Sequence, residues 1–145
     1  MATAVRDSFP ALLLLVLFRC TFGIFRYSQS AGVEGQLLCF GQPAKNVLVK
    51  LYQQSSVLDF LMDIGKSDSN GSFKLGGSAV RSTRIAPKLN IYHDCNDGWK
   101  PCQRKRSYVI PANYISVGLQ PVRFYDLGQV ELSHRAEGET RDCFH

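Results

Sequence analysis

Three histidines are the side chains of this sequence best suited to general acid–base chemistry: His93, His134 and His145. A catalytic base must lie within hydrogen-bond reach of a nucleophile and be oriented by a third group. His93 falls at the end of a predicted strand, where packing or a hydrogen bond accounts for it. The other two fall in a charged C-terminal segment. We therefore expect no catalytic residue and no enzyme activity.

The five cysteines could bind zinc or form disulfides. Cys20 lies in an N-terminal segment that we expect to be removed, which leaves an even number. Thiolates together with His93 and Asp94 could hold zinc, but cysteines of a secreted chain are normally oxidised in pairs. We expect two disulfides, no metal and no cofactor. The four remaining cysteines are Cys39, Cys95, Cys102 and Cys143.

Four cysteines allow three pairings. Cys95 and Cys102 stand at the two ends of a six-residue connection between predicted strands, so a hairpin-like turn would bring them together. We predict a Cys95–Cys102 bridge and, by elimination, a Cys39–Cys143 bridge. The second bridge would close a loop of about 100 residues, and longer loops give more stabilisation. Loss of Cys39 is then expected to impair folding more than loss of Cys102.

A basic cluster surrounds this connection and lies beside a single tryptophan. Strand alternation places Arg104 and Arg106 on the same face. A rigid basic loop with an exposed indole would suit anionic lipid headgroups or an acidic partner. The alternative is a solvated sheet edge that its charge protects from edge pairing. The candidate binding residues are Trp99, Lys100, Arg104, Lys105 and Arg106.

Asn70-Gly71-Ser72 matches the acceptor pattern for N-glycosylation. The alternative is that Asn70 serves only its turn, because Asn-Gly favours tight hairpins.

The elements that position these residues are short alternating segments separated by Gly, Pro and Asn. In the clearest strand, Val47, Val49 and Leu51 point inward. We expect an exposed loop or one short helical turn at 76–86, and a mobile tail from residue 133 except where Cys143 holds it. The pattern predicts an all-β fold, a two-sheet antiparallel β-sandwich of about seven strands. The predicted strands are 33–40, 46–53, 60–66, 72–75, 88–95, 103–110 and 122–132.

The N-terminus has the order of a secretory signal peptide. Arg6 precedes the apolar run 11–18, which is less than half the length of about 20 residues that a membrane span needs. We predict a signal peptide at 1–23, with a cut near 28–30 as the alternative. A mature N-terminal segment would then occupy 24–31, the domain 32–143, and a short tail 144–145.

The charge of the mature chain is modest. Removing residues 1–23 lowers the formal charge from +5 to +4. Such an excess favours anionic surfaces without requiring nucleic acid. We expect a secreted, extracellular protein that does not span the membrane and does not bind nucleic acid.

Three sets of motifs resemble the transthyretin-like family of secreted nematode proteins, and the resemblance covers about residues 32–143. The third set is the specific one. The motifs are VEG at 33–35 with GQPA at 41–44 and NVLV at 46–49, then DSNGSF at 68–73, then IYHDCNDGWKPCQRK at 91–105.

The resemblance implies a prealbumin-type β-sandwich and an extracellular or cell-surface role, and not hormone transport. The distantly similar hydroxyisourate hydrolases end in Tyr-Arg-Gly-Ser and use histidine and arginine residues at a channel mouth. This sequence ends in RDCFH at 141–145 and has no histidine in its first predicted strand, so we expect no hydrolase activity. Two functions remain: an adaptor that engages a cell-surface receptor, extracellular protein or anionic lipid, or a carrier of a small apolar ligand in an oligomer.

Overall fold

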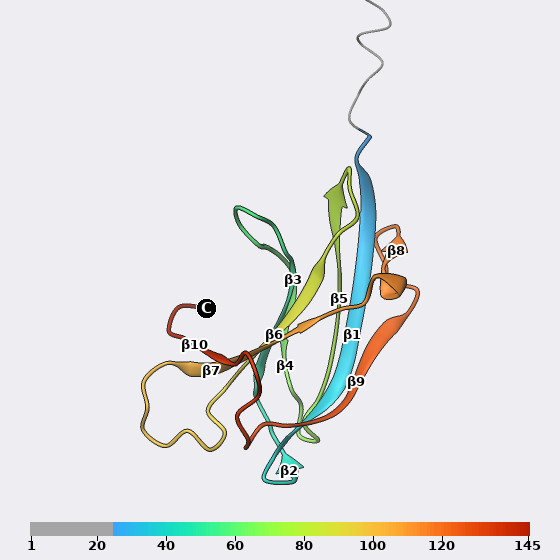
Figure 1. Cartoon of the computed structure of the whole chain (residues 1–145). Helices are drawn as coiled ribbons and strands as arrows, with labels where there is room; N and C mark the ends of the chain where they lie inside the picture. The colour runs from blue at the N-terminus through green and yellow to red at the C-terminus, as the bar shows by residue number, and fades with distance from the viewer. Residues whose placement is uncertain (1–24) are drawn as a thin grey trace, which may run out of the picture.

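A computed structural model describes residues 25–145, which fold almost entirely as β-strands (Figure 1). The predicted signal peptide, 1–23, lies outside these residues. No helix within 25–145 is long and apolar enough to cross a membrane. A short 3-10 helix, η1 (Ala112–Tyr114), lies between the seventh and eighth strands. The strands are β1 (Tyr27–Cys39), β2 (Gln42–Pro43), β3 (Leu48–Gln53), β4 (Phe60–Lys66), β5 (Ser72–Arg81), β6 (Pro87–His93), β7 (Gln103–Val109), β8 (Ser116–Val117), β9 (Phe124–Glu131) and β10 (Thr140–Asp142).

The strands form two sheets that pack against each other. In the first sheet β1 is central and pairs with β2, β5, β8 and β9, while the second sheet has the order β10-β7-β6-β3-β4. Every pair is antiparallel except β1 with β9, whose parallel register runs from Gly32 opposite Phe124 to Leu38 opposite Glu131. The predicted two-sheet antiparallel sandwich is confirmed, with this one parallel pair added.

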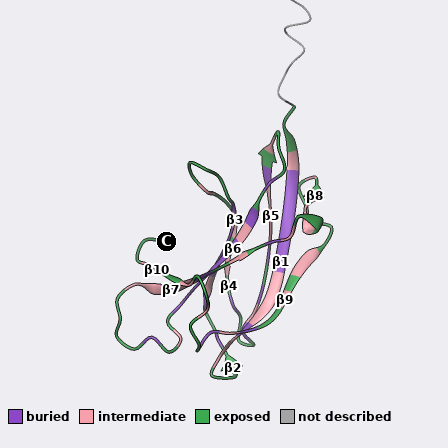
Figure 2. Cartoon of the chain, viewed as in Figure 1, coloured by how far each residue is buried: buried purple, intermediate pink, exposed green. Residues whose placement is uncertain are grey.

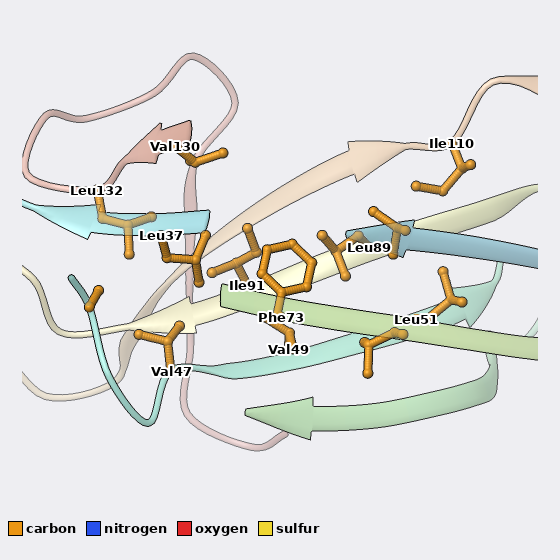
Figure 3. Close-up of a cluster of buried hydrophobic side chains, with 13 residues drawn as sticks. Leu37, Val47, Val49, Leu51, Phe73, Leu89, Ile91, Ile110, Val130 and Leu132 are labelled. Carbon is orange, nitrogen blue, oxygen red and sulfur yellow. The ribbon is translucent and has the colours of Figure 1, made fainter. Parts of the chain in front are cut away.

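The core lies between the two sheets, and strand alternation builds it. The inward residues Val49 and Leu51 of β3 face Leu89 and Ile91 of β6, its neighbour, and all four are fully buried. Full burial of one such side chain contributes about 1.5 to 3 kcal/mol. The inward face predicted for 46–53 is therefore confirmed. Figure 3 shows this cluster, which also contains Leu37, Val47, Phe73, Ile110, Val130 and Leu132.

The predicted exposed loop at 76–86 is wrong over its first half, because β5 continues to Arg81. Two adjacent glycines indicated a loop, but they serve a close approach between strands. A Cβ atom on Gly77 would lie 2.5 Å from the backbone oxygen of Met62 in β4. Only glycine lets β5 pass so near to β4 at the side of the sandwich.

β1 also begins earlier than predicted, at Tyr27 and not at residue 33. Residues 27–31, which we expected to precede the domain, pair with β5 and include a fully buried stretch (Figure 2). Gln29 is buried because its side chain is satisfied: Nε2 donates to the Thr83 carbonyl at 2.7 Å and Oε1 accepts from the Ile85 amide at 3.1 Å. Because buried residues such as Gln29 are polar, the sequence lacks the apolar pattern that would predict a buried strand here.

The predicted mobile tail after residue 133 is wrong as well. Thr140–Asp142 forms β10 and pairs with the beginning of β7. Ser133 is buried, and Asn96 donates a hydrogen bond to its carbonyl at 3.1 Å. The C-terminal segment is thus an integral part of the second sheet.

Candidate functional site

The two disulfides join Cys39 to Cys95 and Cys102 to Cys143. The predicted pairing, Cys95 with Cys102 and Cys39 with Cys143, is therefore wrong, although all four cysteines are bridged. Cys39 ends β1 in one sheet and Cys95 follows β6 in the other, and their Cα atoms lie 5.9 Å apart. Cys102 precedes β7, and β10 brings Cys143 beside it through the Asp142–Gln103 pair.

This pairing places one bridge on each side of the connection between β6 and β7. We call residues 96–101 the bracketed loop, since Cys95 before it is bonded to β1 and Cys102 after it to the C-terminal segment. Trp99 at its tip is fully exposed, and Lys100 is exposed beside it. Asp97 is buried below them and accepts a hydrogen bond from Arg141 Nη1 at 2.9 Å. The bracketed loop thus exposes the Trp99 indole at its tip, while the disulfides fix the loop at both ends.

Two of the predicted surface cations are not at the surface. Arg104 and Arg106 are each 6% exposed, and their Nε atoms donate to the two carboxylate oxygens of Glu139 at 2.5 and 2.9 Å. Both guanidinium groups also donate to the carbonyls of Leu132 and His134. Alternation on β7 correctly places the two arginines on one face, but the C-terminal segment covers that face.

We call Arg104, Arg106 and Glu139 the arginine clamp. Burial alone would raise the pKa of Glu139, but hydrogen bonds from both arginines outweigh it and lower the pKa to about 2. Glu139 therefore stays ionised at physiological pH. Lys105, on the opposite face of β7, is partly exposed and lies 3.3 Å from Asp142. Of the five predicted binding residues, Trp99 and Lys100 stand fully at the surface.

The three histidines are held in different surroundings. His93 is 2% exposed, its Nδ1 accepts from the Cys95 amide at 3.2 Å, and its Nε2 has no hydrogen-bond partner. Burial and the positive charges of Arg104 and Arg106 lower its pKa to about 4. The ring of His145 stacks on Tyr92 with centroids 4.3 Å apart. Among residues 25–145, no three His, Cys, Asp or Glu side chains come together as a metal site.

Acidification should therefore destabilise the protein through His93 before its carboxylates are protonated. An unfolded histidine binds a proton near pH 6.5, whereas the folded His93 resists protonation until about pH 4. Stability should fall as pH decreases from about 6.5 to about 4. Urea unfolding at several pH values should show that His93→Gln loses less unfolding free energy on acidification than the parent does. The control His134→Gln, at an exposed site, should lose as much as the parent. Equal losses in all three would contradict this assignment.

Asn70 lies in the turn between β4 and β5. Its backbone amide donates to Asp68 Oδ1 at 2.8 Å, and Gln36 Nε2 donates to its carbonyl at 2.8 Å. The residue is exposed, so the turn uses its backbone and leaves the side chain accessible. N-glycosylation stays a prediction, which a mass decrease on glycosidase treatment would check.

Comparison with known proteins relates this chain to a family by sequence. A model of the Transthyretin-like family matches residues 34–111. Transthyretin-like protein 5 of Caenorhabditis elegans is 47% identical, covering 92% of this chain and 98% of that protein, and transthyretin-like protein 33 is 45% identical over 82% and 85%. A 9R-lipoxygenase structure from Cyanothece aligns with a TM-score of only 0.39 at 18% identity, covering 72% of this chain and 17% of that one. On the family match and these relatives, the chain belongs to the transthyretin-like family.

Proposed function

We propose that the chain is a secreted extracellular adaptor that engages a receptor or another protein at the cell surface through the bracketed loop. The observation that supports this most strongly is Trp99, the one tryptophan of the sequence, fully exposed between two disulfides. An exposed indole is costly to leave in water and is enriched among the residues that dominate binding energy.

The two bridges lower the cost of binding through this loop. A mobile loop loses conformational freedom when a partner orders it, and this loss reduces affinity. Here Cys95 and Cys102 are already bonded to separate parts of the fold, and Asn96 and Asp97 are hydrogen-bonded below the tip. The loop is therefore ordered before a partner arrives.

The charge of the loop favours a protein partner over a lipid headgroup at this end. We expected four basic residues at the surface, but Arg104 and Arg106 are buried and share the carboxylate of Glu139, and Lys105 lies beside Asp142. Of these four residues, Lys100 alone remains fully exposed, next to Trp99. An indole with one cation fits an apolar pocket beside an acidic side chain.

The carrier of a small apolar ligand is the less favoured function. Ligand pockets are lined predominantly by apolar side chains. A surface hollow of about 480 Å³ is instead lined largely by charged side chains. The charged residues of the hollow are Glu34, Lys66, Asp68, Lys74 and Asp126.

We also propose that the protein binds without catalysis, since His93 is buried, has a lowered pKa and accepts a hydrogen bond from a backbone amide.

The test uses the full-length chain expressed in secreting eukaryotic cells, with protein collected from the medium. Immobilised protein should capture a partner from cell-surface extracts. Trp99→Ala with Lys100→Ala should weaken that binding about thirtyfold or more, the effect of losing a dominant interface residue. The matched control, Phe144→Ala with Lys45→Ala, removes an exposed aromatic residue and an exposed lysine outside the loop. Equal affinity of the loop variant and the parent, or retention of the protein inside the cells, would contradict the proposal.

A further inference from the structure

The outer face of the second sheet carries a lysine on each of four neighbouring strands. Val49 and Leu51 of β3 point into the core (Figure 3), so Lys50 between them points to the other side of the sheet. Residues directly opposite each other on neighbouring strands share a face, and the register extends this assignment across the sheet. We call this surface the lysine face. Its lysines are Lys66 of β4, Lys50 of β3, Lys88 of β6 and Lys105 of β7.

Three of these lysines lie on one diagonal of the sheet. Lys66 pairs with Leu48, which precedes Lys50 by two residues. Lys50 in turn pairs with Asn90, which follows Lys88 by two residues. Diagonal neighbours of this kind are about 7–8 Å apart. The lysines of β4, β3 and β6 therefore form a line of evenly spaced amino groups across three strands.

Lys50 is the unusual member, because a lysine that is nearly buried normally has a carboxylate partner. It is 9% exposed, and no carboxylate within residues 25–145 forms an ion pair with it. Its Nζ lies 5.7 Å from the centre of the Tyr92 ring. The ring attracts the ammonium group but carries no full negative charge. A bound anion would supply the missing counter-charge.

Polar side chains beside Lys50 add hydrogen-bonding groups. Asn90, directly opposite, donates from Nδ2 to the Tyr92 hydroxyl at 3.2 Å and accepts from Ser107 Oγ at 2.7 Å. Burial raises the pKa of Tyr92 to about 12, so its hydroxyl keeps a proton to donate. Ammonium and hydroxyl donors together bind the oxygens of anions such as sulfate.

The free positive charge of the lysine face lies on β3 and β4. Lys88 Nζ lies 2.9 Å from Asp59 Oδ2, and Lys105 Nζ lies 3.3 Å from Asp142 Oδ2. In the part of the chain that the structure describes, the lysines of β3 and β4 form no ion pair, and the lysine of β4 is exposed. An anionic partner would therefore bind most strongly at these two.

We propose that the lysine face binds a sulfated polysaccharide, with Lys50 and Lys66 contacting its sulfate groups. Rows of basic residues on a protein surface attract linear polyanions by complementary charge. A polysaccharide laid along the diagonal meets the two free lysines in succession and needs no deep pocket. The choice of a polysaccharide outside the cell rests on the secretion proposed above.

The residue types favour a polysaccharide over a protein or a nucleic acid. The centres of protein interfaces are depleted of lysine, whereas lysine stands at the middle of this face. Single-stranded nucleic acid stacks its bases on aromatic side chains, but Tyr92 is only 2% exposed and its ring already stacks on His145. Amide and hydroxyl groups suit the hydroxyl groups of a sugar chain. Ile64 and Leu61, exposed at the β4 margin, suit the C–H faces of its rings.

Binding of the secreted full-length protein to immobilised dextran sulfate tests the proposal, with unsulfated dextran as the matched surface. The parent should bind the sulfated polymer and not the unsulfated one. Lys50→Met with Lys66→Met should weaken binding about tenfold or more, the effect of losing hydrogen bonds to a charged group. Lys66→Met alone, at an exposed position, should give a smaller loss. The control, Lys74→Met with Lys100→Met, removes two exposed lysines outside the lysine face and should bind as the parent does.

Thermal melts separate a binding role of Lys50 from a structural one. Methionine matches the length of the lysine stem, and removing a nearly buried charge that has no ion-pair partner should leave the melting temperature unchanged or raise it. A lowered melting temperature together with unchanged binding would show that Lys50 supports the fold, and would overturn the proposal.

The lysine face and the bracketed loop should act independently. Trp99→Ala with Lys100→Ala should bind dextran sulfate as the parent does, and Lys50→Met with Lys66→Met should still capture the protein partner proposed above. Loss of dextran sulfate binding in the loop variant would assign the polysaccharide to the bracketed loop and overturn the present assignment.

Salt dependence and competition complete the test. Binding of a polyanion through two lysines releases counterions and should weaken about tenfold between about 50 and 200 mM sodium chloride. Equal binding to unsulfated dextran, or equal binding by the parent and the doubly substituted lysine variant, would overturn the proposal. Single-stranded DNA or polyglutamate that competes as well as soluble dextran sulfate, at the same concentration of charge, would overturn it in favour of an unselective polyanion site.

Discussion

Glu139→Gln is expected to lower the free energy of unfolding by about 3 to 5 kcal/mol, the cost of removing one partner from a buried ion pair. The side chain of Glu139 is 3% exposed and contacts both Arg104 and Arg106. The amide would leave two buried guanidinium groups without a counter-charge. Because Glu139 also holds residues 132–139 over β7, the loss of stability should extend to the whole second sheet.

Urea unfolding of the parent, Glu139→Gln and Glu137→Gln would measure this effect. Glu137 is exposed and two residues away, so its variant removes the same charge without touching the arginine clamp and should match the parent. The lowered pKa of Glu139 adds a second check. Its stabilisation is complete above the unfolded value of about 4.3 and is lost as pH falls towards 2. A loss below about 1 kcal/mol for Glu139→Gln would show that the clamp does not hold the C-terminal segment.

Replacing Cys39 and Cys95 together by serine is expected to cost about 4 kcal/mol of unfolding free energy. The bridge joins residues 56 apart in sequence and links the two sheets. In the chain-entropy model, removing it frees the unfolded chain to explore more conformations. The Cys102–Cys143 bridge, with a separation of 41, gives nearly the same value. The two double-serine variants should therefore be destabilised to a similar extent, contrary to the larger effect for Cys39 that the sequence predicts.

A peptide map under non-reducing conditions provides the control for this prediction. It should contain a fragment joining Cys39 to Cys95 and another joining Cys102 to Cys143. Recovery of a Cys95–Cys102 fragment would restore the pairing predicted from the sequence. Thermal melts in the presence of a reductant should bring the parent towards the behaviour of the double-serine variants.

The part of the fold that could be predicted is the part whose signal is local. In β3 the alternate residues Val49 and Leu51 are apolar and face the core, and β4 begins and ends at the predicted residues, Phe60 and Lys66. Side chains that alternate between core and solvent produce this pattern directly in the sequence. β1 before residue 33 lacks the signal because buried Gln29 and Ser30 are polar.

The parts that could not be predicted depend on which distant segment covers a face. Alternation correctly assigns Arg104 and Arg106 to one side of β7, but Glu139, the carboxylate to which both donate, lies more than thirty residues further along. The disulfide pairing likewise depends on segments that are distant in sequence. Cys95 and Cys102 are close in sequence, yet each meets a cysteine brought by another strand. Trp99 was named from the sequence only as a candidate binding residue; the structure places it fully exposed, and its role in binding stays a prediction.

The parallel pairing of β1 with β9 has a consequence for how the molecule is made. A ribosome finishes β1 long before β9, so one edge of the first sheet stays open until residue 131 has been synthesised. Pairings between distant segments are slow to form because the intervening chain must first close a large loop. Cys39 can meet Cys95 before the last strands are made, whereas Cys102 must wait for Cys143, 41 residues further along the chain. The second sheet is therefore completed only after residues 132–142 have been synthesised, since these residues cover the arginines of β7 and form β10.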